Sequence, residues 1–191
     1  MASTSRTVWD EHYAAGRDFR GLTASERDLL AEHVPPGSGS RALDVGCGTG
    51  ELALHLAELG YAVDGVDFAE SALERARARG HAAFEGVRWL YGDVEREVPA
   101  ELDESGYDLV TLRLVVAVLR DRSRVLRRLT ARLRPAGALV VITPLAVNTP
   151  EERRGIALDE DEIGALVEGW ASVDRFDAEG LAVLVLRRPP G

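Results

Sequence analysis

The sequence predicts one α/β domain over residues 1–191, in which helices cover both faces of a mostly parallel sheet. Three observations carry this prediction: a glycine-rich loop that joins a short apolar strand to a helix, further apolar strands that alternate with helix-forming segments, and two C-terminal strands joined by a tight turn. Alternating strands and helices favour a parallel sheet. A chain of 191 residues can bury roughly 70% of its unfolded surface in one core.

The glycine-rich loop lies in residues 41–52, where an apolar strand ends in an acid followed by three glycines at every second position. These residues are Asp44, Gly46, Gly48 and Gly50. Glycine gives the backbone freedom and lets a ligand approach where a Cβ would prevent it. Residues 51–59 favour a helix, and Gly60 stands where a glycine commonly ends one. The order of strand, loop and helix indicates a nucleoside-binding turn.

The glycine spacing argues against a dinucleotide. The fingerprint G-x-G-x-x-G would place its third glycine at position 51, which is Glu51. The strand also ends in the carboxylate of Asp44, which would repel a pyrophosphate beside it. A cationic ligand suits this site better.

The loop resembles the S-adenosylmethionine (SAM) loop of class I SAM-dependent methyltransferases, whose usual form is close to LDVGCGTG. A structural glycine turn, or a loop for another nucleotide, is the alternative. The resemblance covers a core of residues 40–145. It implies SAM as cofactor, S-adenosylhomocysteine as product, and a Rossmann-like seven-stranded sheet with an antiparallel C-terminal hairpin strand.

Two further predicted strands end in acids. Residues 61–67 end in Asp67, and residues 87–93 end in Asp93. A carboxylate accepts from two hydroxyls at once, so we expect Asp67 to bind the ribose. In the resembling family, an acid at the place of Asp93 accepts from the adenine amino group. Each acid alone could instead be a turn or helix-entry residue.

The cofactor is therefore expected to contact the glycine loop and the residues after the next two strands. The predicted cofactor-binding residues are Asp44, Gly46, Cys47, Gly48, Gly50, Asp67, Phe68, Asp93 and Val94. Cys47 is the only cysteine, so we expect neither a disulfide nor a cysteine zinc site, and we predict no metal. Ala69 stands where the family often has a capping Ser or Thr, whose loss costs about 1 kcal/mol of helix stability.

The remaining core elements follow in order. Residues 107–112 predict a fourth strand, and residues 134–142 a fifth. Between them, residues 121–134 predict an amphipathic helix with Leu133 on its apolar face and arginines opposite. We favour a solvated basic face over a docking surface.

The C-terminal segment, residues 146–191, predicts a helix that begins at Asp159 and two strands at residues 170–176 and 181–186. This hairpin resembles the antiparallel strands of the methyltransferase sheet. A purely parallel dinucleotide fold lacks them.

The N-terminal segment, residues 1–36, is predicted to be helical. Thr23 and Glu26 have the spacing of a capping box. Trp9 and Tyr13 share a helix face and resemble the W-x-x-x-Y segment that closes over the cofactor in many small-molecule methyltransferases. An ordinary amphipathic helix packed on the sheet is the alternative to such a lid.

The acceptor is expected at the carboxyl ends of the strands, where open α/β sheets bind ligands. The predicted acceptor contacts are Tyr13, Arg17, Arg113 and Thr143. Arg113 could grip a carboxylate or phosphate of the acceptor; pairing with a neighbouring acid is the alternative. No general base is identified. His12 and Arg113 are weak catalytic candidates, and a lone histidine is more often structural.

Composition limits the partners and the location. The net charge of −9 disfavours nucleic acid as a partner. The sequence has neither a long apolar run nor the apolar core of a signal peptide, so we expect a cytoplasmic protein without a membrane partner. All 23 basic residues are arginine, so lysine cannot serve as a base. A monomer or a homodimer is expected.

The sequence therefore predicts a methyltransferase that moves the methyl group of SAM to an oxygen or nitrogen of a small molecule. Orientation should be the main catalytic contribution, because effective molarities of well-placed reactants reach about 10⁵ to 10⁸ M. Two alternatives remain open: a SAM-binding module without methyl transfer, and an enzyme that uses SAM as a scaffold for another reaction.

Overall fold

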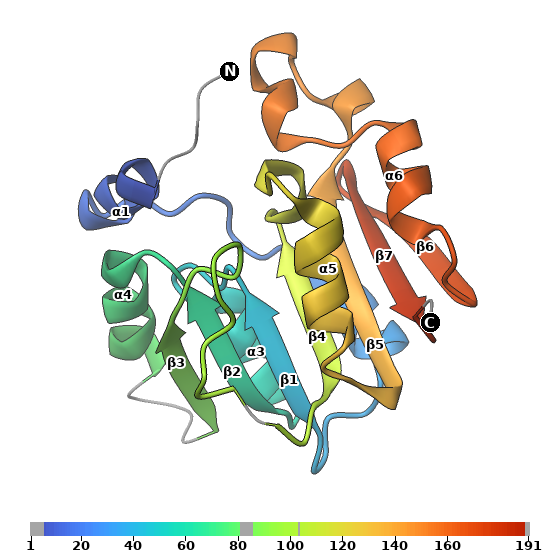
Figure 1. Ribbon diagram of the computed structural model, residues 1–191. Coiled ribbons are helices and arrows are strands. Elements are labelled where there is room, and N and C mark those ends of the chain that lie inside the picture. Colours follow the sequence, from blue (N-terminus) through green and yellow to red (C-terminus); the bar gives the residue numbers. More distant parts are fainter. Residues whose placement is uncertain (1–5, 81–85, 103, 190–191) are drawn as a thin grey trace.

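The computed structural model describes residues 6–80, 86–102 and 104–189 and shows one sheet between helices (Figure 1). All seven predicted strands are present: β1 (Arg41–Val45), β2 (Ala62–Asp67), β3 (Val87–Tyr91), β4 (Tyr107–Arg113), β5 (Leu133–Pro144), β6 (Ser172–Ala178) and β7 (Leu181–Arg187). The α-helices are α1 (Arg6–Ala14), α2 (Ala24–His33), α3 (Glu51–Glu58), α4 (Glu70–Gly80), α5 (Arg122–Thr130) and α6 (Glu160–Val167). Three short 3₁₀ helices are η1 (Val116–Val118), η2 (Ala146–Asn148) and η3 (Glu151–Ile156).

The strands form a single sheet in the order β3-β2-β1-β4-β5-β7-β6. Neighbours among β1 to β5 are parallel, whereas β7 runs antiparallel to both β5 and β6. The strand order reverses between β1 and β4, and such a reversal opens a crevice at the carboxyl ends of the strands. The predicted Rossmann-like sheet with an antiparallel C-terminal hairpin strand is confirmed.

Each face of the sheet carries its own hydrophobic cluster. On one face, α2 and α3 contribute Leu30 and Leu56; on the other, α5 and α6 contribute Val125 and Ile163. Residues of β4 and β5 enter both clusters, so these strands are buried on both sides. Strands buried in this way appear in a sequence as nearly continuous apolar runs, which is how they were recognised.

The amphipathic helix is shorter than the sequence predicts. α5 begins after its N-cap Asp121 and ends at Thr130. Leu133, expected on its apolar face, lies instead in β5 opposite Tyr107. The prediction was wrong at this end of the helix. The carbonyl of Arg132 accepts the Tyr107 N–H at 2.8 Å, so the backbone here pairs with β4 and does not continue the helix.

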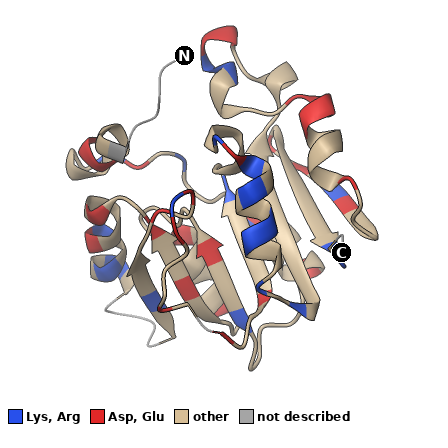
Figure 2. Ribbon diagram, in the orientation of Figure 1, with Lys and Arg blue, Asp and Glu red and all other residues tan. Residues whose placement is uncertain are grey.

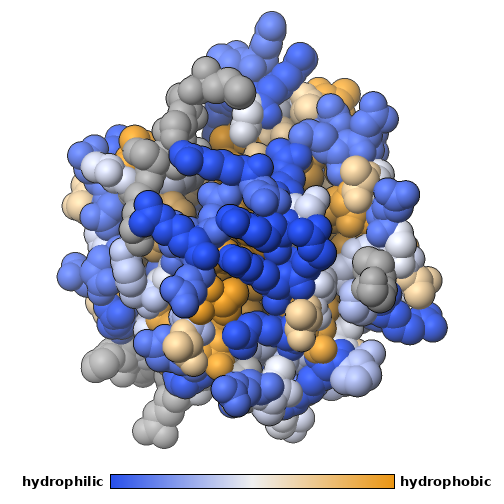
Figure 3. All heavy atoms as spheres, viewed as in Figure 1, coloured by the Kyte–Doolittle hydropathy of each residue, from blue (hydrophilic) through white to orange (hydrophobic). Residues whose placement is uncertain are grey.

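Charge is unevenly distributed over the fold. Figure 2 shows acidic residues at the carboxyl ends of β1 and β2, and arginines along α5. Arg124 and Arg127 on α5 are exposed, and Figure 3 shows a largely hydrophilic surface over this helix with a smaller apolar area beneath it. Among the helices in the described ranges, none has the length and apolar character needed to cross a membrane.

Candidate active site

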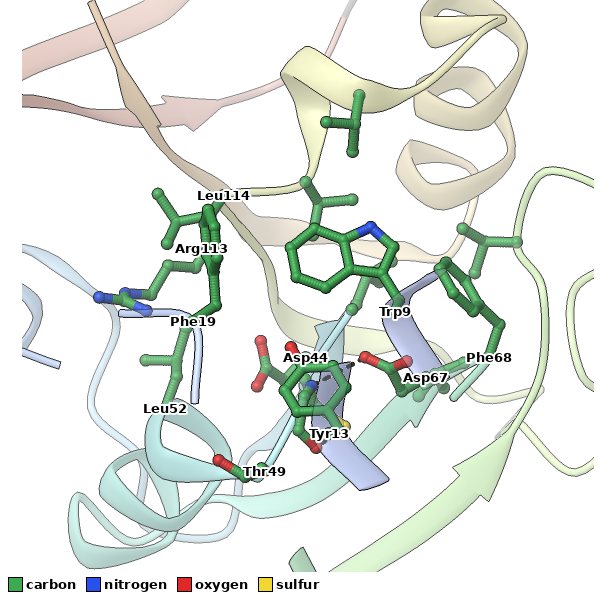
Figure 4. Close-up of a pocket in the computed structure, with 18 of the residues that line it drawn as sticks. Trp9, Tyr13, Phe19, Asp44, Thr49, Leu52, Asp67, Phe68, Arg113 and Leu114 are labelled. Carbon is green, nitrogen blue, oxygen red and sulfur yellow. Dashed lines mark hydrogen bonds between the residues drawn. The ribbon is translucent and has the colours of Figure 1, made fainter. Parts of the chain in front are cut away.

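A cavity opens at the carboxyl ends of β1, β2 and β4 (Figure 4). Its walls come from the N-terminal segment, the glycine loop, the ends of β2 and β3, and the segment after β4. The lining includes Trp9, Tyr13, Phe19, Arg20, Asp44, Gly46, Cys47, Gly48, Asp67, Phe68, Asp93, Val94, Leu114 and Val115. All the predicted cofactor residues except Gly50 are among them. Their contact with a cofactor stays a prediction.

The glycine loop approaches the cavity in a conformation that side chains rarely adopt. Gly46 and Gly48 have φ angles of +68° and +54°. A Cβ on Gly46 would lie 2.4 Å from the side chain of Val115, and one on Gly48 would lie 3.0 Å from the hydroxyl of Tyr13. These two glycines are therefore required by the shape of the cavity wall.

Gly50 differs from the other two loop glycines in its surroundings. It is the N-cap of α3 with a φ of +85°, and it does not line the cavity. A Cβ at this position would lie 2.4 Å from the ring of Trp89, which β3 places behind the loop. Gly50 thus lets the loop pack on Trp89, and its contact with a cofactor stays a prediction.

Asp44 presents an unsatisfied carboxylate oxygen at the end of β1. The residue is 1% exposed, and the Thr111 hydroxyl donates to its Oδ1 at 2.7 Å. Its Oδ2 is buried and finds no hydrogen-bond partner in the described part of the chain. Burial raises the pKa of Asp44 to about 7. Because buried polar atoms are nearly always paired, this oxygen fits a positively charged donor supplied by a ligand.

Asp67 connects the glycine loop to the start of α4. Its Oδ2 accepts the Gly48 N–H and its Oδ1 accepts the Ala69 N–H, both at 2.8 Å. Burial raises the pKa of Asp67. Each carboxylate oxygen can accept a second hydrogen bond, so this geometry leaves room for the predicted bonds from ribose hydroxyls.

The ring of Phe68 and the side chain of Val94 form an apolar wall beside Asp67. Asp93 stands next to this wall, and its Oδ1 accepts the Glu95 N–H at 3.1 Å. A flat apolar ring with a polar edge, as in adenine, fits such a surface.

Helix α1 is fastened to α4 at the edge of the cavity. The carboxylate of Asp10 accepts the backbone N–H of Ser71 at 3.0 Å and its hydroxyl at 2.8 Å. These hydrogen bonds lower the pKa of Asp10. Trp9 and Tyr13 stack at a ring-centroid distance of 5.9 Å, and both line the cavity. This position favours the lid interpretation over an ordinary helix on the sheet.

The same contacts replace the cap that α4 lacks at Ala69. Asp67 accepts the Ala69 N–H, and Asp10 accepts that of Ser71. Side-chain oxygens at a helix start satisfy its free N–H groups. The start of α4 is thus stabilised by tertiary hydrogen bonds as well as by packing.

An ion network in the loop after α1 was not recognised in the sequence. Asp18 pairs with Arg75 at 2.9 Å and with Arg79 at 2.8 Å, and it accepts from the Thr49 hydroxyl at 3.1 Å. This network fixes the chain on both sides of the glycine loop and places Phe19 in the cavity. No local pattern signals it, because its members come from distant parts of the chain.

The structure corrects the role expected for Arg113. Its guanidinium bonds both carboxylate oxygens of Glu26, at 2.7 and 3.1 Å, and donates to the carbonyls of Arg20 and Gly21 at 2.9 and 2.8 Å. Glu26 is fully buried. The guanidinium of Arg113 is thus already bound by groups of the protein, which agrees with the alternative that Arg113 pairs with an acid. Arg113 holds the segment that carries Phe19 rather than an anionic acceptor.

Three other candidates lie away from the cavity lining. Thr143 is fully buried in β5, and Arg17 is exposed. The ring of His12 packs edge-on against Trp9 and Tyr13, and within the described ranges its buried Nε2 has no hydrogen-bond partner. The expected acceptor contacts of Thr143 and Arg17, and a catalytic role for His12, have no support in this geometry. Of the expected acceptor contacts, Tyr13 and Arg113 do line the cavity, although the guanidinium of Arg113 is engaged by Glu26.

Comparison with known proteins agrees with this architecture. The family model of a methyltransferase domain matches residues 43–141. The 27-O-demethylrifamycin SV methyltransferase of Amycolatopsis mediterranei (strain S699) is 31% identical over 89% of this chain and 61% of its own. A ubiquinone biosynthesis O-methyltransferase of Idiomarina loihiensis (strain ATCC BAA-735 / DSM 15497 / L2-TR) is 32% identical over 78% of this chain and 60% of its own.

A SAM-dependent methyltransferase from Aquifex aeolicus shares the fold, with a TM-score of 0.74, 17% identity and coverage of 94% of this chain and 98% of that one. The chain spans about 61% of the length of the first curated relatives that it matches. The family model covers more than half of the chain, from β1 into β5, and includes the whole glycine loop. The chain therefore belongs to the class I SAM-dependent methyltransferases.

Proposed function

We propose that the protein transfers the methyl group of SAM to an oxygen or nitrogen of a small-molecule acceptor. One observation carries the proposal: the cavity presents two buried carboxylates, Asp44 and Asp67, on either side of the glycine loop and continues into an apolar compartment. The first part suits a cationic nucleoside and the second an acceptor. Relatives named 27-O-demethylrifamycin SV methyltransferase and ubiquinone biosynthesis O-methyltransferase support the small-molecule class.

The cofactor is proposed to lie along the glycine loop. Asp67 would hold the ribose, and Phe68, Asp93 and Val94 would surround the adenine. The unpaired Oδ2 of Asp44 would accept from the ammonium of the amino-acid tail, which would explain why this buried oxygen has no partner among the described residues.

The carboxylate of that tail would meet Arg20. This side chain lines the cavity, and among the described residues its guanidinium makes one hydrogen bond, of 3.4 Å, to the carbonyl of Glu179. The other N–H groups of the Arg20 guanidinium have no hydrogen-bond acceptor among the described residues. Arg20 is therefore the lining arginine with donors to offer, whereas Arg113 is engaged by Glu26.

The protein's contribution is mainly orientation. Bound SAM supplies a methyl group that its positive sulfur already activates. The stacked rings of Trp9 and Tyr13 exclude water from one side, and the glycine loop fixes the other. Holding an acceptor lone pair in line with the methyl group is then the main requirement.

Incubation with SAM that carries a heavy-isotope methyl group, followed by mass spectrometry of a metabolite extract, tests the proposal. A labelled product is expected from the wild-type protein and not from a Gly48→Val variant. Calorimetric binding of SAM with no labelled product would favour a binding module instead.

We extend the proposal to a cytoplasmic monomer or homodimer that binds neither nucleic acid nor membranes, and that works as one domain with residues 1–36 as a lid. The net charge of −9 supports weak affinity for polyanions. Sedimentation analysis and a DNA-binding assay at low salt would test these points.

A further inference from the structure

We propose that the acceptor is a planar aromatic molecule without charged substituents that is methylated on its own acidic hydroxyl, with no proton taken by the protein. This inference rests on the proposed methyl transfer and specifies its substrate. The geometry and the charges of the acceptor end of the cavity support it.

The acceptor end is apolar and shaped by rings. In the view of Figure 4, Phe19, Leu52 and Leu114 lie on one side of the cavity and Asp67 and Phe68 on the other. The rings of Trp9 and Phe19 meet edge to face at 5.0 Å and 85°. A planar aromatic ligand can continue such an arrangement, because offset and edge-to-face contacts are the favoured ones.

Leu114, at the end of β4, has an unusual backbone conformation. It has a φ of +61°, an unusual conformation for a residue with a side chain. The Leu114 N–H donates to the carbonyl of Ile142 at 2.7 Å, which holds the strained backbone at the end of β4. Such strain gathers at functional sites, where the surrounding structure fixes it. Here it places an apolar side chain in the acceptor end.

Among the described residues, the arginines at the acceptor end are already assigned to other partners. Arg113 is engaged by Glu26 and by two backbone carbonyls. Arg20 is assigned to the carboxylate of the cofactor. A charge placed in an apolar cavity without a partner is strongly disfavoured, so the acceptor should carry no charged group besides the reacting oxygen, whose negative charge after ionisation would face the positive sulfur of SAM.

The acidic side chains of the lining are likewise engaged. Glu51 accepts the Leu22 N–H at 2.8 Å, and Glu95 accepts the Arg120 N–H at 2.7 Å. Asp18 forms ion pairs with two arginines. Asp44 and Asp67 belong to the cofactor end, and burial raises the pKa of Tyr13 so that it stays protonated at neutral pH. Every carboxylate of the described lining, Asp93 included, thus already has a hydrogen-bond or ion-pair partner in the protein, and we expect none of them to take a proton from the acceptor.

A reaction without a protein base requires a hydroxyl that ionises unaided. The hydroxyl proton passes to water, and the phenolate oxygen forms a bond to the methyl carbon. The carbon–sulfur bond breaks with its electron pair remaining on sulfur, which becomes neutral. An aliphatic alcohol would need a general base to react in this way, whereas an acidic phenol would not.

A panel of matched acceptors tests the inference with heavy-methyl SAM and mass spectrometry. It contains a nitrophenol, a methylphenol, a hydroxybenzoate and a methylcyclohexanol, together with the metabolite extract. At pH 7 we expect kcat/KM for the nitrophenol to exceed that for the methylphenol and the hydroxybenzoate at least tenfold, with no product from the cyclohexanol. The pH midpoint of kcat/KM should move with the pKa of each phenol.

Substitutions of Phe19, in the apolar wall of the acceptor end, give a second test. Phe19→Leu should lower kcat/KM for the nitrophenol about tenfold and Phe19→Ala about 100-fold, with the Kd of SAM unchanged. Val147→Ala is the matched control, since Val147 is 81% exposed outside the cavity.

The outcomes separate this inference from the proposed function. Preferred methylation of the hydroxybenzoate or the cyclohexanol, a pH midpoint that stays fixed across phenols, or a labelled extract product that is charged or aliphatic would overturn the inference and leave methyl transfer intact. No labelled product from the panel or the extract, with SAM binding confirmed by calorimetry, would overturn the proposed function itself.

Discussion

The two ends of the cavity are built in different ways. The cofactor end consists of residues at the tips of consecutive strands, such as Asp44 and Asp67, and it carries buried charge. The acceptor end is apolar and joins Phe19 to Leu114, which the Arg113–Glu26 ion pair helps to bring together. The comparison teaches that the cofactor end depends on local motifs, whereas the acceptor end depends on long-range contacts. Changes at the two ends should therefore separate cofactor binding from acceptor binding.

Gly48→Val should have the largest effect, because it places a side chain in the cofactor end. The residue has a φ of +54°, and a Cβ there would lie 3.0 Å from the Tyr13 hydroxyl. We expect SAM binding to be lost in calorimetry while circular dichroism shows a folded sheet. Gly164→Ala, at a site with open space around it, is the control. Affinity retained within about threefold, or roughly 0.65 kcal/mol, would show that this loop does not bind the cofactor.

Arg113→Ala should act on the acceptor end through stability. Breaking a buried pair leaves the fully buried Glu26 uncompensated, which typically costs about 3–5 kcal/mol. We expect a lower free energy of unfolding in denaturant titration and a raised acceptor KM, with the affinity for SAM little changed.

Arg113→Lys should restore only part of the stability, because an ammonium cannot reproduce the fork. An unchanged unfolding free energy together with a raised acceptor KM would instead return Arg113 to the role of an acceptor contact.

Asp67→Ala should weaken SAM and S-adenosylhomocysteine by similar factors, since both contain the ribose. The lost hydrogen bonds to a charged acceptor are worth about 1.5–3 kcal/mol. Some of this loss would come from the Gly48 N–H, which Asp67 also accepts. Calorimetry with both ligands measures the effect. If neither affinity changes, Asp67 serves only to anchor the loop.

The smallest expected effect is the pH dependence caused by Asp44. Burial raises its pKa to about 7, so below pH 7 the free protein holds a neutral carboxyl that attracts no ammonium. The affinity for SAM should rise as pH increases from about 5.5 to 7, by at most about tenfold per pH unit, and binding near pH 6 should release a proton.

Asp44→Asn should abolish this pH dependence, and 5′-methylthioadenosine, which lacks the amino-acid tail, should not show it. Calorimetry in two buffers of different ionisation enthalpy counts the proton. A SAM affinity that is constant over this range would remove Asp44 from the tail site.

The sequence predicted the sheet well, and it singled out Asp44 and Asp67, which the structure places in the cavity lining, because both results depend on short-range patterns. Buried strands appear as apolar runs, and Asp44 and Asp67 follow such runs directly. The packing of Gly50 on Trp89 could not be predicted, because the position of Trp89 under the loop depends on β3. Arg113 was misassigned for the same reason, since its partner Glu26 lies far away in the sequence and only the fold brings them together.

A crystal structure of the complex with S-adenosylhomocysteine tests the division of the cavity most directly. We expect the ribose hydroxyls within hydrogen-bond distance of Asp67, the ammonium on Oδ2 of Asp44, and the space between Phe19 and Leu114 left for the acceptor. Adenosine placed between Phe19 and Leu114, with Asp67 bonded only to the protein, would contradict the assignment of the two ends.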